Sequence, residues 1–356
     1  MATPQPKGTI LVTGAGGYVG GQIVREALES GFNVRITART ESSATRTISN
    51  YPSFASALSY TLVPDMTILE SYAPAFADGA IEGIIHSASP VNFSPQDNVR
   101  DLLDPAIKGA TTILEAARRF GRGKVRRVVV TSSFAAVVDP EKGVRPGYTY
   151  DEKDWNPVTW EGAVTAQKLT AYMASKTLAE RAMWRWMDEH GDDVAFTLAT
   201  ICPPWVFGPY VRAPATRAAL SESVLLLDDI VDGAAVPPFD YGGYADSREV
   251  AAAHVRALEA PDGVAGGQRF LVGQNFRYQA AVDGAREALP EARARLPVGK
   301  PGDRSPEDAH RFDGSKAARV LGVEYGTLKD TAVETYKQLF EIRKLEREEE
   351  EAKAKA

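Results

Sequence analysis

The stretch Lys7-Gly-Thr-Ile-Leu-Val-Thr-Gly-Ala-Gly-Gly-Tyr-Val-Gly20 decides the fold of this 356-residue chain. Its apolar residues 10–12 predict a buried strand, and three of its glycines follow that strand at a G-x-x-G-x-x-G spacing. Residues 22–30 then predict a helix, and residues 33–38 predict a second strand. A strand–turn–helix–strand unit of this kind is typical of a fold that binds a dinucleotide.

Each glycine of this spacing meets a physical demand of such a site. Gly14 permits the tight turn after the strand, Gly17 lets the backbone approach a pyrophosphate, and Gly20 lets the helix pack close to the strand. The helix N-terminus offers N–H groups and the positive end of its dipole to the phosphates. The alternative is a glycine-rich turn in some other α/β fold, but the flanking strand and helix favour a dinucleotide.

The residue after the second predicted strand bears on which dinucleotide is bound. An acidic residue at this place holds the ribose 2′-hydroxyl of NAD, whereas an arginine suits the 2′-phosphate of NADP. Arg39 occupies the place, Arg35 could assist it, and Glu41 lies two residues later. We therefore expect Arg39 to bind the 2′-phosphate of NADP; the alternative for Arg39 is a solvated loop residue.

Strand and helix patterns alternate along the first 202 residues. Further strands are predicted at 60–63, 83–87, 125–130 and 194–201, and helices at 41–57, at 98–120 with a kink or restart at Pro105, and at 165–190. This alternation predicts an α/β fold, a Rossmann-type doubly wound parallel sheet with right-handed crossovers. The pattern loosens after Cys202, which predicts a smaller C-terminal substrate lobe.

The domain organisation follows from that change of pattern. We expect residues 1–202 to form an NADP-binding domain, to which elements from about 240–275 return. Residues 203–340 are expected to form a small substrate-binding lobe that is interleaved with it. Residues 341–356 are a charged tail, which predicts a frayed and solvated helix end.

The composition excludes several classes of protein. A net charge of −6 offers no attraction to nucleic acid or to an anionic membrane, and no stretch approaches the roughly 20 apolar residues of a membrane helix. The single cysteine lies in an apolar run and predicts a buried thiol, and the four histidines lack the spacing of a metal site. We expect a cytoplasmic monomer or homodimer with no metal and with no nucleic-acid or membrane partner.

Three residues carry the candidate chemistry. Tyr172 and Lys176 lie four residues apart within the helix predicted at 165–190, so both project from one face of it. A lysine ammonium one turn away favours the phenolate and is expected to lower the pKa of the tyrosine, which suits an acid–base group. Ser133 ends the strand predicted at 125–130, where its hydroxyl can stabilise a developing alkoxide. The alternative is an ordinary amphipathic helix face.

These motifs together resemble one family. Thr13-Gly-Ala-Gly-Gly-Tyr-Val-Gly20, Thr131-Ser-Ser133 and Tyr172-Met-Ala-Ser-Lys176 are similar to motifs of the extended short-chain dehydrogenase/reductases. The branch most similar to this sequence contains dihydroflavonol reductases, cinnamoyl-CoA reductases and fungal NADPH-dependent aldehyde and ketone reductases. The resemblance runs nearly end to end and includes His86-Ser-Ala-Ser-Pro90 and Lys176-Thr-Leu-Ala-Glu180.

The resemblance implies roles for individual residues. It implies Ser133, Tyr172 and Lys176 as the catalytic triad, with Lys176 also on the nicotinamide ribose, and Asp65 near the adenine. The residues expected to contact NADPH or NADP are Gly14, Gly17, Tyr18, Val19, Gly20, Arg39, Asp65, Met66, Ser87, Ala88, Tyr172, Lys176 and Pro203. The candidate apolar substrate pocket consists of Phe93, Phe134, Trp205 and Val206, each of which could equally be a core residue.

At two places this sequence departs from the family patterns, and these departures narrow the range of activities that we expect. Val138 stands where dihydroflavonol reductases carry an asparagine, and residues 170–176 lack the cinnamoyl-CoA reductase signature. The expected function is therefore reduction of an aldehyde or ketone by NADPH. The alternatives are an NAD-dependent epimerase or hydroxysteroid dehydrogenase-type enzyme, and a non-catalytic NADP-sensing regulator. Phe134-Ala135 replaces the Asp-Glu pair of sugar dehydratases, and both Tyr172 and Lys176, which sensors usually lose, are present.

Overall fold

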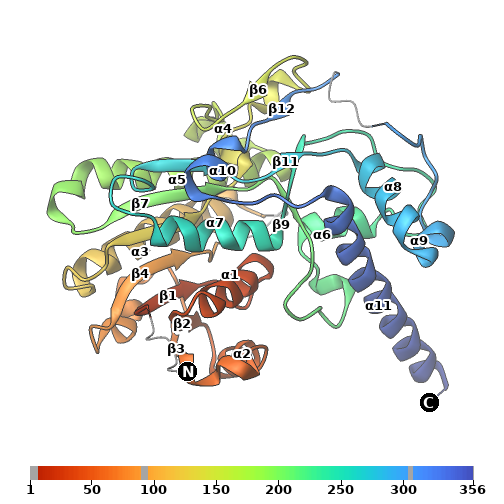
Figure 1. Ribbon diagram of the computed structural model, residues 1–356. Coiled ribbons are helices and arrows are strands. Elements are labelled where there is room, and N and C mark those ends of the chain that lie inside the picture. The colour runs from red at the N-terminus through yellow and green to blue at the C-terminus, as the bar shows by residue number, and fades with distance from the viewer. Residues whose placement is uncertain (1–6, 90–94, 304–307, 356) are drawn as a thin grey trace.

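A seven-stranded parallel sheet forms the centre of the computed structural model, which describes residues 7–89, 95–303 and 308–355 (Figure 1). The strand order is β10-β7-β5-β4-β1-β2-β3, and every neighbouring pair is parallel. The strands are β1 (Thr9–Thr13), β2 (Asn33–Ala38), β3 (Leu58–Leu62), β4 (Ile81–His86), β5 (Arg127–Thr131), β7 (Thr197–Cys202) and β10 (Gln268–Leu271). The order reverses between β1 and β4, which confirms the predicted doubly wound Rossmann-type fold and places a ligand crevice at that point.

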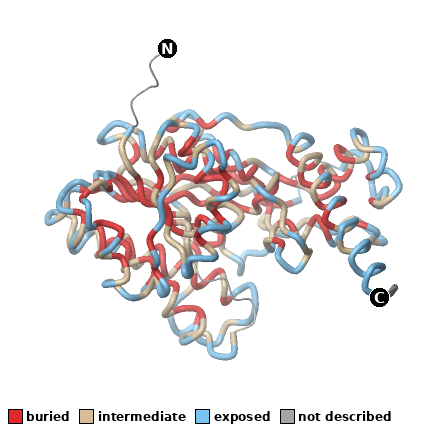
Figure 2. Tube along the Cα trace, turned by 90° about the horizontal axis from the view of Figure 1, so that it is seen from below, coloured by how far each residue is buried: buried red, intermediate tan, exposed pale blue. Residues whose placement is uncertain are grey.

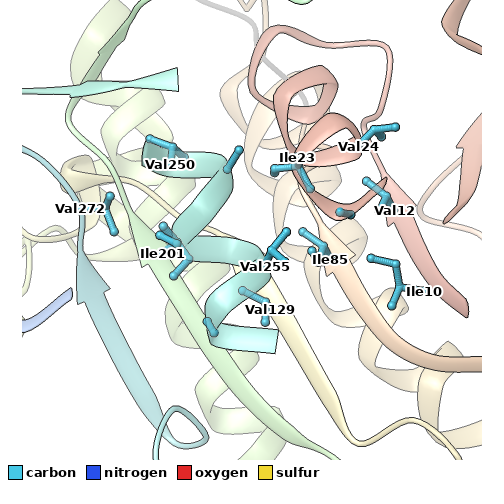
Figure 3. Close-up of a cluster of buried hydrophobic side chains, with 14 of the residues drawn as sticks. Ile10, Val12, Ile23, Val24, Ile85, Val129, Ile201, Val250, Val255 and Val272 are labelled. Atoms are coloured by element: carbon cyan, nitrogen blue, oxygen red, sulfur yellow. The ribbon is translucent and has the colours of Figure 1, made fainter. Parts of the chain in front are cut away.

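Alternate residues of each strand face opposite sides of the sheet. On one side, Ile10 and Val12 of β1 pack with α1 (Tyr18–Glu29) and α7 (Ser247–Glu259), as Figure 3 shows. On the other side, Leu11 of β1 packs with α3 (Asp104–Phe120) and α5 (Lys168–His190). Two apolar layers therefore hold the strand ends in place, and Figure 2 shows the buried residues concentrated along the sheet.

Several local predictions are confirmed by the helices. The predicted restart at Pro105 is observed: a single π turn over Val99–Leu103 precedes α3, and Pro105 lies in the first turn of that helix. α7 begins with a capping box, in which Asp246 and Glu249 exchange side-chain and backbone hydrogen bonds. Cys202 and His86 are buried, and His86 Nδ1 lies 2.9 Å from the Thr13 hydroxyl.

A smaller lobe stands at the carboxyl edge of the sheet. Its sheet has the order β11-β9-β8, with β8 (Trp205–Phe207), β9 (Gly243–Asp246) and β11 (Gln274–Asn275). Figure 1 shows its helices gathered beside one end of the main sheet: α6 (Glu222–Asp228), α8 (Tyr278–Ala288), α9 (Pro290–Arg295) and α11 (Leu328–Lys355). The chain returns to the main sheet as β10, followed later by α10 (Ser315–Leu321). The division at residue 202 stays a prediction.

The remaining elements lie at the periphery. The region 139–163 contains β6 (Thr149–Tyr150), which pairs with β12 (Arg311–Phe312), and the start of α4 (Trp160–Thr165). α2 (Glu41–Ile48) and a 3₁₀ segment at Pro52–Ala57 follow β2. α11 continues through the charged tail, where Lys353 pairs with Glu349 one turn away at 2.7 Å. Among the described residues, no helix has the length and apolar character needed to cross a membrane.

Candidate active site

The glycine turn brings the N-terminus of α1 to the crevice of the sheet. Gly14 has a φ of +73°, and a Cβ there would lie 2.7 Å from backbone atoms of residues 87 and 88, so only glycine fits. A Cβ on Gly20 would lie 2.0 Å from the Gly14 carbonyl oxygen. Gly17 is the N-cap of α1 and, as a glycine, has no side chain with which to cap it. An uncapped helix N-terminus at a cavity suits an anionic diphosphate.

A cavity of about 420 Å³ lies between this turn, the ends of β4 and β5, α5 and the small lobe. Twelve of the residues predicted to bind cofactor or substrate line it: Gly14, Gly17, Tyr18, Val19, Gly20, Ser87, Ser133, Tyr172, Lys176, Pro203, Trp205 and Val206. A larger cavity of about 980 Å³ lies between α2 and α11, and none of Ser133, Tyr172 and Lys176 lines it. We therefore place the candidate chemistry in the smaller cavity.

The three candidate catalytic residues converge on this cavity from two elements. Ser133 follows β5 and caps a short 3₁₀ turn at Phe134–Ala136, where its Oγ accepts a hydrogen bond from the Ala135 N–H at 3.1 Å. Tyr172 and Lys176 lie on the same face of α5, and Lys176 Nζ is 5.5 Å from the centre of the Tyr172 ring. The same ammonium donates to the Ser89 hydroxyl at 2.7 Å.

Burial dominates the electrostatics of the pair on α5. It raises the pKa of Tyr172 to about 12, the hydrogen bond with Ser133 opposes that rise, and the charge of Glu222 adds to it. Burial also lowers the pKa of Lys176 to about 8. The expectation that the ammonium lowers the pKa of the tyrosine is wrong for this protein without ligand, because burial of the phenolate raises that pKa. Tyr172 therefore carries its proton at neutral pH.

A buried charge network holds the elements behind Ser133 together. Glu180, one turn after Lys176 on α5, accepts hydrogen bonds from the Ser132 hydroxyl at 2.6 Å and from the Thr200 hydroxyl at 2.8 Å. Arg269 on β10 donates to the same carboxylate at 2.8 Å. Burial raises the pKa of Glu180, and the Arg269 charge and these hydrogen bonds together bring it below its usual range. The network joins β5, β7 and β10 to the helix that carries Tyr172 and Lys176.

The residues predicted for the adenine half lie outside this cavity. Arg39 follows β2 and Asp65 follows β3, so both stand at the carboxyl edge of neighbouring strands, and both are exposed. The Asp65 carboxylate accepts hydrogen bonds from the backbone and hydroxyl of Thr67, which lower its pKa. Arg35 is ion-paired with Asp78 at 2.6 Å, and its assistance to Arg39 stays a prediction. Either Arg39 or Asp65 could meet a nucleotide that runs along this edge.

Three other predicted contacts fall elsewhere. Met66 packs partly buried against the core layer beneath α3, and the Ala88 N–H donates to the Thr13 hydroxyl at 3.1 Å. Phe134 is fully buried among aromatic rings and does not line the cavity, so the core alternative describes its position. Its ring centroid is 5.6 Å from that of Tyr150 and 5.1 Å from that of Tyr241. Phe93 lies outside the described residues.

Sequence reasoning missed part of the cavity wall. The wall also contains Ser89, Leu169, Leu220, Glu222 and Tyr241. Leu220, Glu222 and Tyr241 come from the small lobe, where no motif marks them and where only the fold brings them to Ser133. Ser89 lies in a segment quoted only as a landmark of the family.

Comparison with known proteins places the chain among nucleotide-dependent enzymes. The model of the NAD dependent epimerase/dehydratase family matches residues 10–273. The chain is 33% identical to an NADPH-dependent methylglyoxal reductase of Saccharomyces cerevisiae, over 94% of this chain and 98% of the relative. It is 35% identical to a ketoreductase of Aspergillus niger, over 90% and 94% of the two chains. The crystal structure of yeast methylglyoxal/isovaleraldehyde reductase complexed with NADPH superposes with a TM-score of 0.86 at 31% identity, covering 95% of this chain and 99% of that one.

Proposed function

The chain belongs to the NAD dependent epimerase/dehydratase family, as its resemblance to the extended short-chain dehydrogenase/reductases indicates, and on that premise we propose that it reduces aldehydes or ketones to alcohols with NADPH. One observation carries the proposal. Ser133, Tyr172 and Lys176 line the same cavity as the glycine turn and the uncapped N-terminus of α1. A cofactor-binding turn and an acid–base group beside one cavity are the two parts that carbonyl reduction needs.

In the proposed complex, each part of the cofactor has a matching part of the protein. The N-terminus of α1 holds the diphosphate, Arg39 holds the 2′-phosphate, and Asp65 lies near the adenine. Lys176 holds the nicotinamide ribose, and with a pKa lowered to about 8 it presents an ammonium to the anionic cofactor at neutral pH. When bound, NADPH supplies a hydride from C4 of its nicotinamide to the carbonyl carbon.

The protein supplies the other half of the reaction. The Ser133 hydroxyl donates a hydrogen bond to the carbonyl oxygen and so orients it. Tyr172, which carries its proton at neutral pH, gives that proton to the oxygen as negative charge develops there. The carbonyl double bond thus gains one hydride at carbon and one proton at oxygen and becomes an alcohol. Lys176 stabilises the phenolate that Tyr172 leaves behind.

The size of the cavity and the relatives favour small substrates. The relatives are named for methylglyoxal and isovaleraldehyde, which are compact carbonyl compounds. Trp205, Val206 and Leu220 give the cavity an apolar side on which a short carbon chain can pack. We propose short aliphatic aldehydes and ketones as the substrate class.

The test follows the absorbance of the reduced nicotinamide. Purified protein is mixed with NADPH or NADH and with a panel of aliphatic aldehydes, ketones and diketones, and Tyr172→Phe is assayed in parallel. Turnover that prefers NADPH and falls by about 10²–10⁴ in Tyr172→Phe supports the proposal. Binding of NADPH without turnover of any carbonyl would favour the sensor alternative, and NAD that copurifies with the protein would favour the epimerase.

A further inference from the structure

Tyr241 is a second phenol at the candidate active site, and the proposed mechanism does not use it. It comes from the loop before β9 and lines the cavity together with Ser133 and Tyr172. Interaction with the Ser133 side chain opposes the raised pKa of each of the two phenols. Three side chains with hydroxyl groups, two from the large lobe and one from the small lobe, therefore line the same cavity.

The surroundings of Tyr241 fix its position. Its ring centroid lies 4.9 Å from that of Trp205, and on another side the Phe134 ring meets it edge to face. Asp240 accepts hydrogen bonds from the Tyr241 N–H at 2.5 Å and from the Trp205 indole N–H at 3.3 Å. Tyr278 anchors the same carboxylate, donating its hydroxyl at 2.5 Å. A side chain held this way presents its hydroxyl to the cavity at little further cost in conformational entropy.

A count of hydrogen bonds at the reacting oxygen indicates a role for the Tyr241 hydroxyl. A carbonyl oxygen has two lone pairs, and the proposed reaction fills them with the Ser133 and Tyr172 hydroxyls. Tyr241 then has no place on the reacting oxygen. Burial keeps its pKa above the usual range, so it remains a donor at neutral pH. A donor beside the reacting oxygen suits a second acceptor on the neighbouring carbon of the substrate.

We propose that Tyr241 donates a hydrogen bond to the second oxygen of vicinal dicarbonyl substrates, and so makes 2-oxoaldehydes and 1,2-diketones the preferred class. This inference rests on the proposed function. It assigns specificity to a residue of the small lobe, whereas proton transfer stays with Tyr172. Discrimination of this kind follows because only a dicarbonyl compound offers this hydroxyl a second substrate oxygen as acceptor.

The test uses matched pairs of substrates that differ by one oxygen. The pairs are 2-oxopropanal with propanal, and 2,3-butanedione with 2-butanone. For Tyr241→Phe we expect kcat/KM to fall about tenfold for the dicarbonyl of each pair, the size of one net hydrogen bond, and to change less than about twofold for the monocarbonyl. Because the ratio within a pair is measured on one preparation, a partial loss of active protein cancels.

Tyr150→Phe is the matched control. Tyr150 also packs edge to face on Phe134, but it does not line the cavity. We expect its substitution to leave both ratios unchanged. Equal losses for both members of a pair in Tyr241→Phe would overturn the inference and assign the hydroxyl to Ser133 instead, and no loss for either would overturn it as well. Absence of NADPH-dependent turnover in the wild-type protein would refute the proposed function, which is a separate outcome.

Discussion

The two walls of the candidate active site are built differently. The wall from the large lobe comes from regular elements, with the glycine turn at the start of α1 and the pair Tyr172 and Lys176 on α5. The wall from the small lobe comes from a short strand and loops, with Trp205 on β8 and Tyr241 before β9. In the proposed mechanism, proton transfer and cofactor binding therefore depend on local spacing, whereas substrate choice depends on distant segments that the fold brings together.

Of the substitutions considered, removal of the buried ion pair behind the large-lobe wall should lower the free energy of unfolding the most. Glu180→Ala leaves Arg269 buried without its carboxylate partner, and we expect the free energy of unfolding to fall by about 3–5 kcal/mol. Thermal or denaturant unfolding measures this loss. The matched control is Glu259→Ala, whose ion pair with Lys7 is exposed and contributes about 0–1 kcal/mol. Equal losses in the two variants would contradict the role given to the network.

The glycine turn offers the next test of the same wall. A Cβ on Gly20 would lie 2.0 Å from the Gly14 carbonyl oxygen, so Gly20→Ala must displace the backbone of the turn. We expect a loss of about 3 kcal/mol in stability and a weaker affinity for NADPH, measured by fluorescence titration. Gly191→Ala is the control, because a Cβ there meets no atom within 4 Å. An unchanged affinity in Gly20→Ala would argue against a cofactor at this turn.

A substitution at Arg39 tests the choice between NADPH and NADH separately from the choice of substrate. Arg39→Ala should lower kcat/KM for NADPH by about 10- to 100-fold, the worth of a charge-assisted hydrogen bond, and leave the value for NADH nearly unchanged. Arg35→Ala serves as the control, since Arg35 is ion-paired with Asp78. If both variants shift the ratio of NADPH to NADH equally, the assignment of Arg39 fails.

The smallest expected effect is a pH dependence. The pKa of Lys176 is lowered to about 8, so its ammonium is present below that pH and is lost as the pH rises through it. A cation attracts the anionic cofactor, and we therefore expect the dissociation constant for NADPH to increase between about pH 7 and pH 9.5. Lys176→Met should abolish this dependence, and Lys124→Met, whose ammonium donates to the Gly79 carbonyl, should preserve it. The same dependence in Lys176→Met would assign it to another group.

The sequence predicts most of the large lobe because its signals are local. The spacing of Gly14, Gly17 and Gly20, the β-branched residues of the strands and the i, i+4 pair on α5 each act within a few residues, and the sheet order confirms the fold that they imply. The raised pKa of Tyr172 could not be predicted in the same way. It arises from burial in the folded protein, an effect that the spacing of Tyr172 and Lys176 does not contain.

The cavity residues of the small lobe could not be predicted from the sequence, for a physical reason. Tyr241 lies 108 positions after Ser133 in the sequence, and its place at the cavity depends on the pairing of β8 with β9 and on the anchor at Asp240. None of these contacts leaves a periodic pattern. Phe134 illustrates the opposite error. Its position next to Ser133 in the sequence predicts a place in the cavity wall, but its ring is buried in the core.

The central claim is transfer of a hydride from NADPH to a carbonyl carbon at the Ser133–Tyr172–Lys176 site. The most direct test supplies 2,3-butanedione with NADPH that carries deuterium on one or the other face of nicotinamide C4, and analyses the alcohol by mass spectrometry and NMR. We predict that deuterium from one of the two labelled cofactors appears on the carbinol carbon, in step with the NADPH consumed. An alcohol without deuterium from either cofactor, or no consumption of NADPH, would contradict the account.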